Sequence, residues 1–244
     1  MNQQTAPPRQ LPPDAIGCRA LATDYDGTIA HEGRVEPATL DALRRLRASG
    51  RKLFLVTGRR FDELKLIFPE ADEFDAVVAE NGAHVRWPHE QRDELLGQRP
   101  PPEFMAQLAG AGVKPLATGH VIVATFEPYE KVVLETIKTM GLELQVIFNK
   151  GAVMVLPSGI NKASGLKRVL KQLGIKPDEV VAVGDAENDH AFFEYCGFSA
   201  AVANALPSVR EHARWVLQRR YGGGVEELIG LILDPRNPDS TGTP

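Results

Sequence analysis

Two aspartates lie close together near the beginning of the chain, in the stretch LATDYDGTIA at residues 21–30. Asp24 and Asp26 follow an apolar run and precede a glycine and a threonine. Carboxylates this close repel each other, and removing them from water costs free energy unless a cation compensates their charge. A simple Asp-Gly turn would also explain the stretch. A calcium loop would not, because Ile29 and Val35 occupy the positions at which that loop needs a glycine and a glutamate.

A second acidic stretch, VAVGDAENDH at residues 181–190, weakens the interpretation as a simple turn. Asp185, Glu187 and Asp189 again follow an apolar run, with Asn188 among them. Carboxylates gathered at one place favour a hard divalent cation, and Mg²⁺ is usually bound through one or two carboxylates, waters and substrate phosphate. The two stretches therefore predict a magnesium site, provided that the fold brings them together.

The elements that must position these side chains alternate in the order typical of a parallel sheet. Strands are expected within residues 18–24, 52–58, 76–79, 179–185 and 198–205, and helices within residues 36–50, 59–68, 161–174, 186–197 and 225–233. This alternation predicts a Rossmann-like α/β core with right-handed crossovers. Ligands bind such sheets at the carboxyl ends of the strands. The polar residues expected at those ends are Asp24, Asp26, Thr57, Gly58 and Asp185. The glycine run YGGG at residues 221–224 is expected to form a turn before the last helix.

Residues 83–156 interrupt this order with shorter, more alternating strands and two helical stretches, which predict a small α+β domain with an antiparallel sheet. Gly82 and Gly159 would serve as its hinges. The expected organisation is a disordered tail over residues 1–17, a catalytic core over 18–82 and 157–233, the inserted domain over 83–156, and a second disordered tail over 234–244.

The bulk composition excludes several classes of protein. The 244 residues carry a net charge of −4, which is no basic footprint for nucleic acid. No apolar run approaches the ~20 residues that span a bilayer, and the first residues lack the basic and apolar regions of a signal peptide. Cys18 and Cys196 are the only cysteines, which suits a reducing compartment. We therefore expect a cytoplasmic protein, monomeric or homodimeric, without nucleic-acid or membrane partners.

Four short motifs resemble those of a known family. They are DYDGT at residues 24–28, TGR at 57–59, NKASGL at 161–166 and GDAEND at 184–189. In this order they are similar to the motifs of the haloacid dehalogenase-like phosphatases. The nearest resemblance is to the Cof-type, sucrose-phosphatase-like branch, which includes archaeal phosphoglycolate phosphatases and carries its cap domain between the second and third motifs. The resemblance extends from about Cys18 to Leu233, and the insertion at residues 83–156 falls where that cap lies.

The chain departs from the family pattern at a few positions. Tyr25 replaces a residue that is often aliphatic, which should affect packing and not chemistry. Ala163 and Ser164 follow Lys162 where a glycine is frequent, but the lysine itself is present.

The resemblance implies a magnesium-dependent phosphatase that works through an aspartyl-phosphate. Asp24 would be the nucleophile and Asp26 the general acid and base. Mg²⁺ would bridge Asp24, the phosphate and Asp185, with the backbone carbonyl of Asp26 as a further ligand. Asp189 would hold the metal directly or through water. The presence of Asp26 favours hydrolysis or transfer of a phosphomonoester.

The resemblance also implies a set of groups that bind the phosphate. Lys162 would supply a positive charge, and the hydroxyl of Thr57 would donate a hydrogen bond. Backbone amides near Gly27 and Gly58 would donate others. Asn188 would position the phosphate or its own loop.

The inserted domain would close over the site and contact the organic part of the substrate. Candidate contacts are Arg59, Asn81, His84, Arg86, His120 and Lys150. His84, His120 and His190 lack the spacing of metal ligands, so a structural or surface role is expected for them. The small size of the insertion favours a compact substrate such as a sugar phosphate or phosphoglycolate.

Three other functions remain open from the sequence. A phosphomutase or phosphotransferase would use the same aspartyl-phosphate. A phospho-accepting signalling module would also use a strand-end aspartate with magnesium, although such receivers are about half this length and carry no cap. A catalytically idle scaffold is disfavoured because every core motif position is retained.

Overall fold

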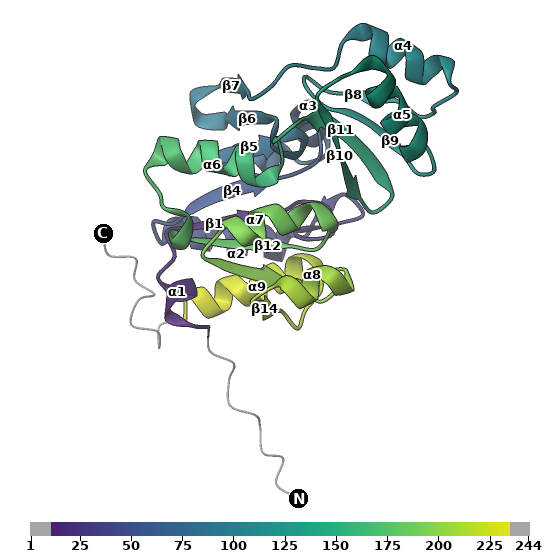
Figure 1. Cartoon of the computed structure of the whole chain (residues 1–244). Helices are drawn as coiled ribbons and strands as arrows, with labels where there is room; N and C mark the ends of the chain where they lie inside the picture. The colour runs from purple at the N-terminus through teal and green to yellow at the C-terminus, as the bar shows by residue number, and fades with distance from the viewer. Residues whose placement is uncertain (1–10, 235–244) are drawn as a thin grey trace, which may run out of the picture.

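The computed structural model describes residues 11–234 and is built on an eight-stranded sheet in the order β14-β13-β12-β1-β4-β5-β6-β7 (Figure 1). All pairs from β14 to β5 are parallel, and the pairs β5–β6 and β6–β7 are antiparallel. The strands are β1 Ala20–Thr23, β4 Lys52–Val56, β5 Ala76–Ala79, β6 His84–Trp87, β7 Arg92–Leu95, β12 Val180–Gly184, β13 Phe198–Ala201 and β14 Trp215–Val216. The parallel α/β core expected from the sequence is confirmed.

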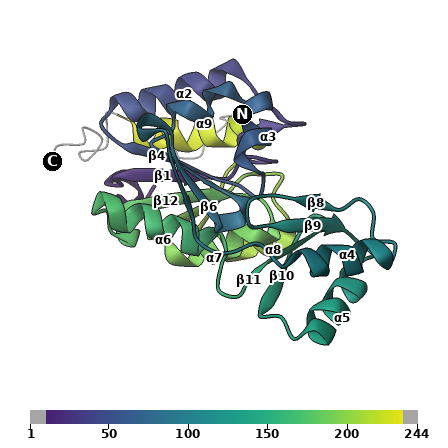
Figure 2. The same cartoon turned by 90° about the horizontal axis from the view of Figure 1, so that it is seen from above.

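The central strands are buried because helices cover both faces of the sheet. Every residue of β1, β5, β12 and β13 is buried, as is usual for parallel strands with two covered faces. Helices α2 (Pro37–Ala48) and α9 (Tyr221–Ile232) lie on one face, and α6 (Lys162–Leu173) and α7 (His190–Tyr195) lie on the other (Figure 2). The remaining helices of the core are α1 Pro13–Ile16, α3 Phe61–Ile67 and α8 Pro207–His212.

Helix α6 begins at a fixed residue because its first turn is capped. The side chain of Asn161 accepts a hydrogen bond from the backbone N–H of Ser164 at 3.0 Å, and the hydroxyl of Ser164 accepts one from the N–H of Asn161 at 3.0 Å. Such a reciprocal pair satisfies two N–H groups that would otherwise lack partners. It also places Lys162 in the first turn of the helix, facing the interior.

A separate four-stranded antiparallel sheet, in the order β10-β11-β9-β8, lies beside the core (Figure 1). Its strands are β8 Ala117–Thr118, β9 Val123–Phe126, β10 Leu144–Asn149 and β11 Ala152–Pro157, and its helices are α4 Pro102–Gly110 and α5 Glu130–Met140. These elements share an apolar cluster of their own, which includes Phe104, Leu108, Val133 and Val153. This α+β unit fits the cap expected from the sequence.

Two strands near the start of the predicted insertion belong to the large sheet and not to the small one. Residues 84–95 were expected in the insertion, but β6 and β7 are hydrogen-bonded to β5 and extend the large sheet. The chain reverses at the short 3-10 helix η2 (Glu80–Gly82), so that Val85 lies opposite Val78. The alternating polarity of these residues is that of an edge hairpin. The division of the chain at residues 83 and 156 into core and cap stays a prediction.

Two further expectations are wrong. Residues 11–17 are ordered: α1 packs on the core through the buried Leu11 and Ile16, and Arg51 donates to the carbonyl of Ile16 at 2.9 Å. The glycines at 222–224 belong to α9 and form no separate turn. A Cβ on Gly222 would come within 2.1 Å of the hydroxyl of Thr39, so the first turn of α9 packs too closely for a side chain. The rest of the predicted tails, residues 1–10 and 235–244, lies outside the described residues.

The remaining elements are short and gave no clear pattern in the sequence. They are β2 Ala30–His31, β3 Arg34–Val35, η1 Pro69–Glu73, η3 Pro88–Glu90, η4 Pro177–Glu179 and η5 Glu187–Asp189. Cys18 and Cys196 are both buried free thiols, as expected. None of the helices formed within residues 11–234 combines the length and the apolar character needed to cross a membrane.

The contact of α6 with the turn after β5 generates a test of the fold. A Cβ on Gly165 would lie 2.4 Å from Cγ1 of Val78 and 2.7 Å from the carbonyl oxygen of Gly82. We expect Gly165→Ala to lower the free energy of unfolding by about 1–3 kcal/mol, the usual cost of overpacking, measured by urea denaturation. The matched control is Gly230→Ala in the exposed face of α9, where nothing lies within 4 Å. This change should be neutral or stabilising by up to about 1 kcal/mol, and equal effects at the two sites would contradict the packing described.

Candidate active site

The polar residues at the strand ends meet at one edge of the large sheet. Asp24 directly follows β1, and its N–H extends the ladder to the carbonyl of Val183 in β12 at 3.0 Å. Asp185 directly follows β12, and Thr57 directly follows β4. Because β12, β1 and β4 are adjacent parallel strands, their carboxyl ends bring these residues side by side.

Lys162 joins this edge from the first turn of α6. Its ammonium lies 2.5 Å from Oδ1 of Asp24 and 2.5 Å from Oδ1 of Asp189. All three side chains are buried. An uncompensated charge at such a place costs several kcal/mol, so the lysine stabilises both carboxylates and they stabilise the lysine.

Asp189 is held by the backbone of its own loop. Its Oδ2 accepts hydrogen bonds from the N–H of Asp185 at 2.7 Å and from the N–H of Ala186 at 2.9 Å. A Cβ on Gly184 would lie 2.4 Å from the same oxygen. The glycine before Asp185 therefore leaves the room that this turn requires.

Asp185 receives contacts from both sides of the site. The hydroxyl of Thr28 donates to its Oδ1 at 3.0 Å. The ammonium of Lys150, from the turn between β10 and β11, donates to its Oδ2. The backbone N–H of Lys150 also donates to the carboxylate of Glu187 at 3.1 Å. The tip of the cap hairpin is thus fastened to the acidic loop of the core.

Two carboxyl groups of the site, Asp24 and Asp185, have a raised pKa. Burial raises the pKa of Asp24 well above its ordinary value, the charges of Asp189 and Asp185 add to the increase, and Lys162 opposes it. Burial and the charge of Asp189 also raise the pKa of Asp185, against the contacts from Lys150 and Thr28. Burial lowers the pKa of Lys162, but the charges of Asp189 and Asp24 outweigh it and raise that pKa overall. The carboxylates therefore repel one another, and a cation bound between them would relieve this repulsion.

Three of these residues could hold a divalent metal ion. Asp24, Asp185 and Asp189 each offer a carboxylate oxygen, and these oxygens lie within 4.8 Å of one another. All three are buried, and the two ammonium groups around them leave one negative charge uncompensated. A donor set made only of oxygens is typical of hard cations. The residues present therefore fit a divalent ion at this position.

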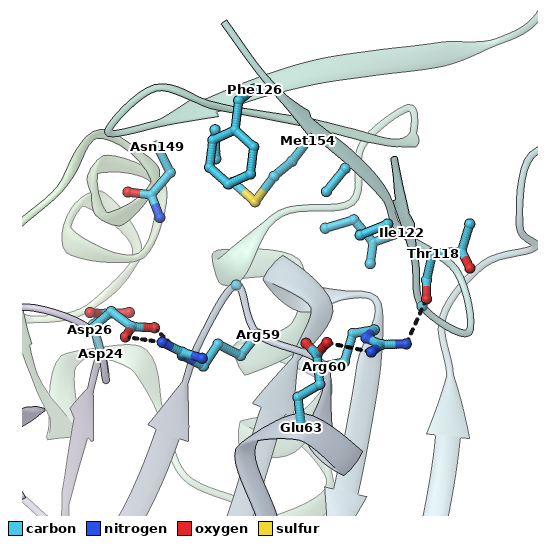
Figure 3. Close-up of a pocket in the computed structure, with 15 residues that line it drawn as sticks. Asp24, Asp26, Arg59, Arg60, Glu63, Thr118, Ile122, Phe126, Asn149 and Met154 are labelled. Carbon is cyan, nitrogen blue, oxygen red and sulfur yellow. Dashed lines mark hydrogen bonds and ion pairs between the residues drawn. The ribbon is translucent and has the colours of Figure 1, made fainter. Parts of the chain in front are cut away.

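Asp26 lies nearer to solvent than Asp24 and is paired with Arg59. Nε of Arg59 lies 2.6 Å from Oδ2 of Asp26, and Nη2 lies 2.8 Å from Oδ1, which makes a bidentate contact (Figure 3). The guanidinium also lies over the ring of Tyr25, 5.7 Å from its centroid. Tyr25 itself is buried and donates to the carbonyl of Gly33 at 3.0 Å. Its role is in packing, as the sequence predicts.

A cavity of about 260 Å³ opens above these carboxylates, between core and cap. Asp24, Asp26, Gly58 and Arg59 line it from the core (Figure 3). The opposite wall is mostly apolar and comes from the small sheet, through Ile122, Ala124, Phe126, Ala152 and Met154. Asn149 and Thr118 add polar groups to this wall. The cavity thus has an acidic floor that could take a phosphate and an apolar roof that could cover the rest of a substrate.

Comparisons with known proteins agree with this geometry. The family model described as haloacid dehalogenase-like hydrolase matches residues 21–109 and 119–229. The chain belongs to this family. A phosphoglycolate phosphatase from Methanothermobacter thermautotrophicus is 32% identical over 224 residues, which are 88% of this chain and 99% of the relative. The enzyme of the same name from Methanothrix thermoacetophila is 30% identical and covers 86% of this chain and 95% of its own.

Solved structures share the fold of this haloacid dehalogenase-like hydrolase at low sequence identity. The crystal structure of Thermoplasma acidophilum 0175 has a TM-score of 0.77 at 15% identity and covers 88% of this chain and 98% of its own. A haloacid dehalogenase-like hydrolase from Bacteroides thetaiotaomicron has a TM-score of 0.73 at 18% identity and covers 88% of this chain and 99% of its own. Both support the arrangement of a parallel core with a smaller second sheet.

Of the remaining sequence-predicted phosphate ligands, Gly58 lines the cavity, whereas Thr57 and Asn188 are not among its lining residues. The hydroxyl of Thr57 accepts from the N–H of Arg59 at 3.1 Å, and Gly58 lines the cavity. The amide of Asn188 donates to the side-chain oxygen of Asn81 at 2.9 Å. The Oδ1 of Asn188 is buried and has no hydrogen-bond partner among residues 11–234. Asn188 therefore retains an unused polar atom, but the roles of these residues stay predictions.

The six candidate substrate contacts are spread over several places. Arg59 lines the cavity, Lys150 contacts Asp185, and Asn81 positions Asn188. The other three, His84, Arg86 and His120, line a different cavity on the far side of the loop that precedes β9. His190 packs edge to face against His212, with 4.7 Å between the ring centroids.

Sequence reasoning missed several residues of the site. Thr28 lies within the first motif and was available from it, whereas Asn149, Phe126 and Met154 follow no motif. Their only signal is an alternating pattern in short cap strands, which says nothing about which face meets the core. The acidic floor is predictable from the sequence, and the roof is not.

The buried lysine provides a test of the site's electrostatics. We expect Lys162→Met to lower the free energy of unfolding by about 3–5 kcal/mol, because Asp24 and Asp189 would remain buried without their partner. The measurement is denaturant unfolding followed by circular dichroism in the presence of a chelator. The control is Lys167→Met on the exposed face of the same helix, which should change stability by less than about 0.5 kcal/mol. Equal stability of the two variants would show that the buried contact contributes nothing.

Proposed function

We propose that this chain is a magnesium-dependent phosphatase that hydrolyses a small phosphate monoester through an aspartyl-phosphate on Asp24. The observation that carries the proposal is the position of Asp24, buried at the floor of a cavity and paired with Lys162 at 2.5 Å. A carboxylate in such a place is an established kind of nucleophile for phosphoryl transfer. The relatives named phosphoglycolate phosphatase support the same reaction class.

The reaction divides between the two aspartates of the first motif. An oxygen of Asp24 attacks the phosphorus, and the bond between phosphorus and the leaving alkoxide breaks while Asp26 supplies a proton to that alkoxide. A water then gives its proton to Asp26 and attacks the phosphorus of the acyl-phosphate. This second step releases inorganic phosphate and restores the carboxylate of Asp24. Arg59 pairs with both oxygens of Asp26, which favours the charged form, so this contact would open when Asp26 carries the proton.

Positive groups are needed because a carboxylate and a phosphate dianion repel each other. Lys162 would contribute one of them, and the hydroxyl of Thr57, the N–H groups near Gly58 and the amide of Asn188 would hold the phosphate oxygens. Bound Mg²⁺, held by Asp24, Asp185 and Asp189, would supply the charge that offsets this repulsion.

The substrate is proposed to be compact and acidic, with phosphoglycolate as the first candidate. The cavity is small, about 260 Å³. Arg59 lines the cavity beside Asp26, and Arg60 lines it beside Thr118; a second anionic group of the ester would lie near these two arginines. Arg60 donates to the backbone carbonyl of Thr118 at 2.8 Å, and its Nε is buried without a partner in the described part of the chain. The guanidinium is also paired with Glu63, which lines the same cavity, so a carboxylate of the substrate would compete with that ion pair.

We further propose that the protein acts in the cytoplasm, as a monomer or a homodimer, on the small molecule alone. The net charge of −4 offers no basic surface for nucleic acid.

The nucleophile is tested by Asp24→Asn. We expect hydrolysis of phosphoglycolate and of p-nitrophenyl phosphate to fall by at least roughly 10³-fold, as for other essential nucleophiles, while the circular dichroism spectrum is unchanged. Removal of metal by a chelator should abolish turnover of the unmodified protein, and added Mg²⁺ should restore it. Asp41→Asn, at an exposed carboxylate, is the control. Normal turnover in Asp24→Asn would refute the assignment, and turnover without metal would refute the role of the ion.

The roof of the cavity is tested by Phe126→Ala. Phe126 lines the cavity and is 53% exposed, so its removal should change substrate choice more than stability. We expect the ratio of kcat/KM for p-nitrophenyl phosphate to that for phosphoglycolate to rise by roughly tenfold, because a widened pocket tolerates the larger group. Phe148→Ala is the matched control, since Phe148 is also exposed but does not line the cavity. An unchanged ratio, or the same change in the control, would contradict the proposed position of the substrate.

A further inference from the structure

A second cluster of potential metal ligands lies where the cap loop before β9 meets the core. Glu80, His84 and His120 each offer a ligand atom, and these atoms lie within 4.8 Å of one another. Glu80 and His84 belong to the core, at η2 and the start of β6, whereas His120 belongs to the loop between β8 and β9. None of the three lines the catalytic cavity.

Glu80 is a fully buried carboxylate that binds the loop through its backbone. It accepts hydrogen bonds from the N–H groups of His120 at 2.7 Å, Val121 at 2.7 Å and Ile122 at 2.9 Å. Its side chain has no exposed surface. Of these three N–H groups, only that of His120 donates to Oε1, and the other two donate to Oε2. A carboxylate oxygen can accept more than one contact, so Oε1 can also bind an ion.

His84 carries a buried ring nitrogen that has no hydrogen-bond partner in the described part of the chain. Its Nε2 lies 2.7 Å from Oδ1 of Asp93, and the side chain is 2% exposed. With Nε2 donating to the carboxylate of Asp93, the neutral ring carries its lone pair on Nδ1. That Nδ1 is buried and has no hydrogen-bond partner within residues 11–234.

His120 completes the cluster from the cap side and leaves it open to solvent. Its Nδ1 lies 3.3 Å from Oε1 of Glu80, and its ring meets that of His84 edge to face with 5.0 Å between centroids. The side chain is 47% exposed. A cavity of about 270 Å³ is lined by both histidines, Arg86 and Asp93, so an ion has a path to the cluster. The positive charge of Arg86 would not repel a bound cation strongly, because its guanidinium is paired with Asp93 at 2.6 Å.

We propose that Glu80, His84 and His120 bind a divalent transition-metal ion, for which Zn²⁺ is the best match, at a site distinct from the catalytic carboxylates. Two imidazoles and one carboxylate, with a fourth position open to water, are a ligand set that Zn²⁺ adopts in proteins. Asp93 supplies the carboxylate partner that orients a metal-bound histidine through its second nitrogen. Tetrahedral ligand atoms about 2.1 Å from an ion lie about 3.4 Å from one another. The ligand atoms here lie within 4.8 Å of one another, so they need to approach by no more than about 1.4 Å. A rotation of the exposed side chain of His120 can supply this movement.

Such an ion would connect the cap loop to the core beside the catalytic cavity. Ile122, two residues after His120, lines the roof of that cavity. Binding of the ion would therefore hold this part of the roof in place, and amide exchange of residues 120–122 should slow when the ion is added.

The test is titration of the tag-free protein with Co²⁺, with Mg²⁺ in large excess to occupy the carboxylate site. Co²⁺ replaces Zn²⁺ and gives a visible absorption band when its coordination is tetrahedral. We expect one Co²⁺ per chain with this band, its displacement by Zn²⁺, and its loss in His120→Ala. Because His120 is half exposed, that variant should fold normally. Asp93→Asn should keep the ligands but weaken binding by roughly 10–100-fold.

Two control variants distinguish this site from the catalytic carboxylates and from the histidine pair on α7 and α8. Asp24→Asn should retain the band, since the catalytic carboxylates are not involved. His190→Ala should also retain it, because that histidine belongs to a different ring pair with His212. The proposal is overturned if no band forms, if the band survives in His120→Ala, or if Asp24→Asn abolishes it.

Discussion

The structure depends on one buried contact, in which the ammonium of Lys162 lies 2.5 Å from both Asp24 and Asp189. Each of these charges would cost several kcal/mol if it were buried alone. Since Asp24 follows β1, Lys162 begins α6 and Asp189 follows β12, this single contact joins a strand end, a helix start and a loop. The requirement to keep the charges paired thereby determines where three distant segments of the chain meet.

Close backbone packing makes this arrangement possible. Helix α6 can bring Lys162 to the sheet edge only because Gly165 and Gly82 allow the helix to approach the turn after β5. The capping box at Asn161 then begins the helix one residue before the lysine. Lys150, from the cap, adds a second ammonium on Asp185. The charge that remains uncompensated is negative, which favours a divalent cation; the bound cation would then attract a phosphate.

The sequence predicted the parallel core and the acidic floor well, for a physical reason. Asp24 and Asp185 each follow a mostly apolar run, and such runs form buried parallel strands whose ends share one edge. Short elements were less predictable. The hairpin of β6 and β7 has the alternating polarity of an edge and resembled the start of the insertion. Glu80 and His120 are far apart in the sequence, and only the fold of the cap loop brings them together.

The balance of charge at the sheet edge is measured most directly by calorimetric titration of the protein with inorganic phosphate, with and without Mg²⁺. Three buried carboxylates and two ammonium groups should repel an anion until a divalent cation reverses the local charge. We therefore expect phosphate to bind when Mg²⁺ is present and to give no measurable heat in a chelator. The same affinity for phosphate in both conditions would contradict the electrostatic basis of the site.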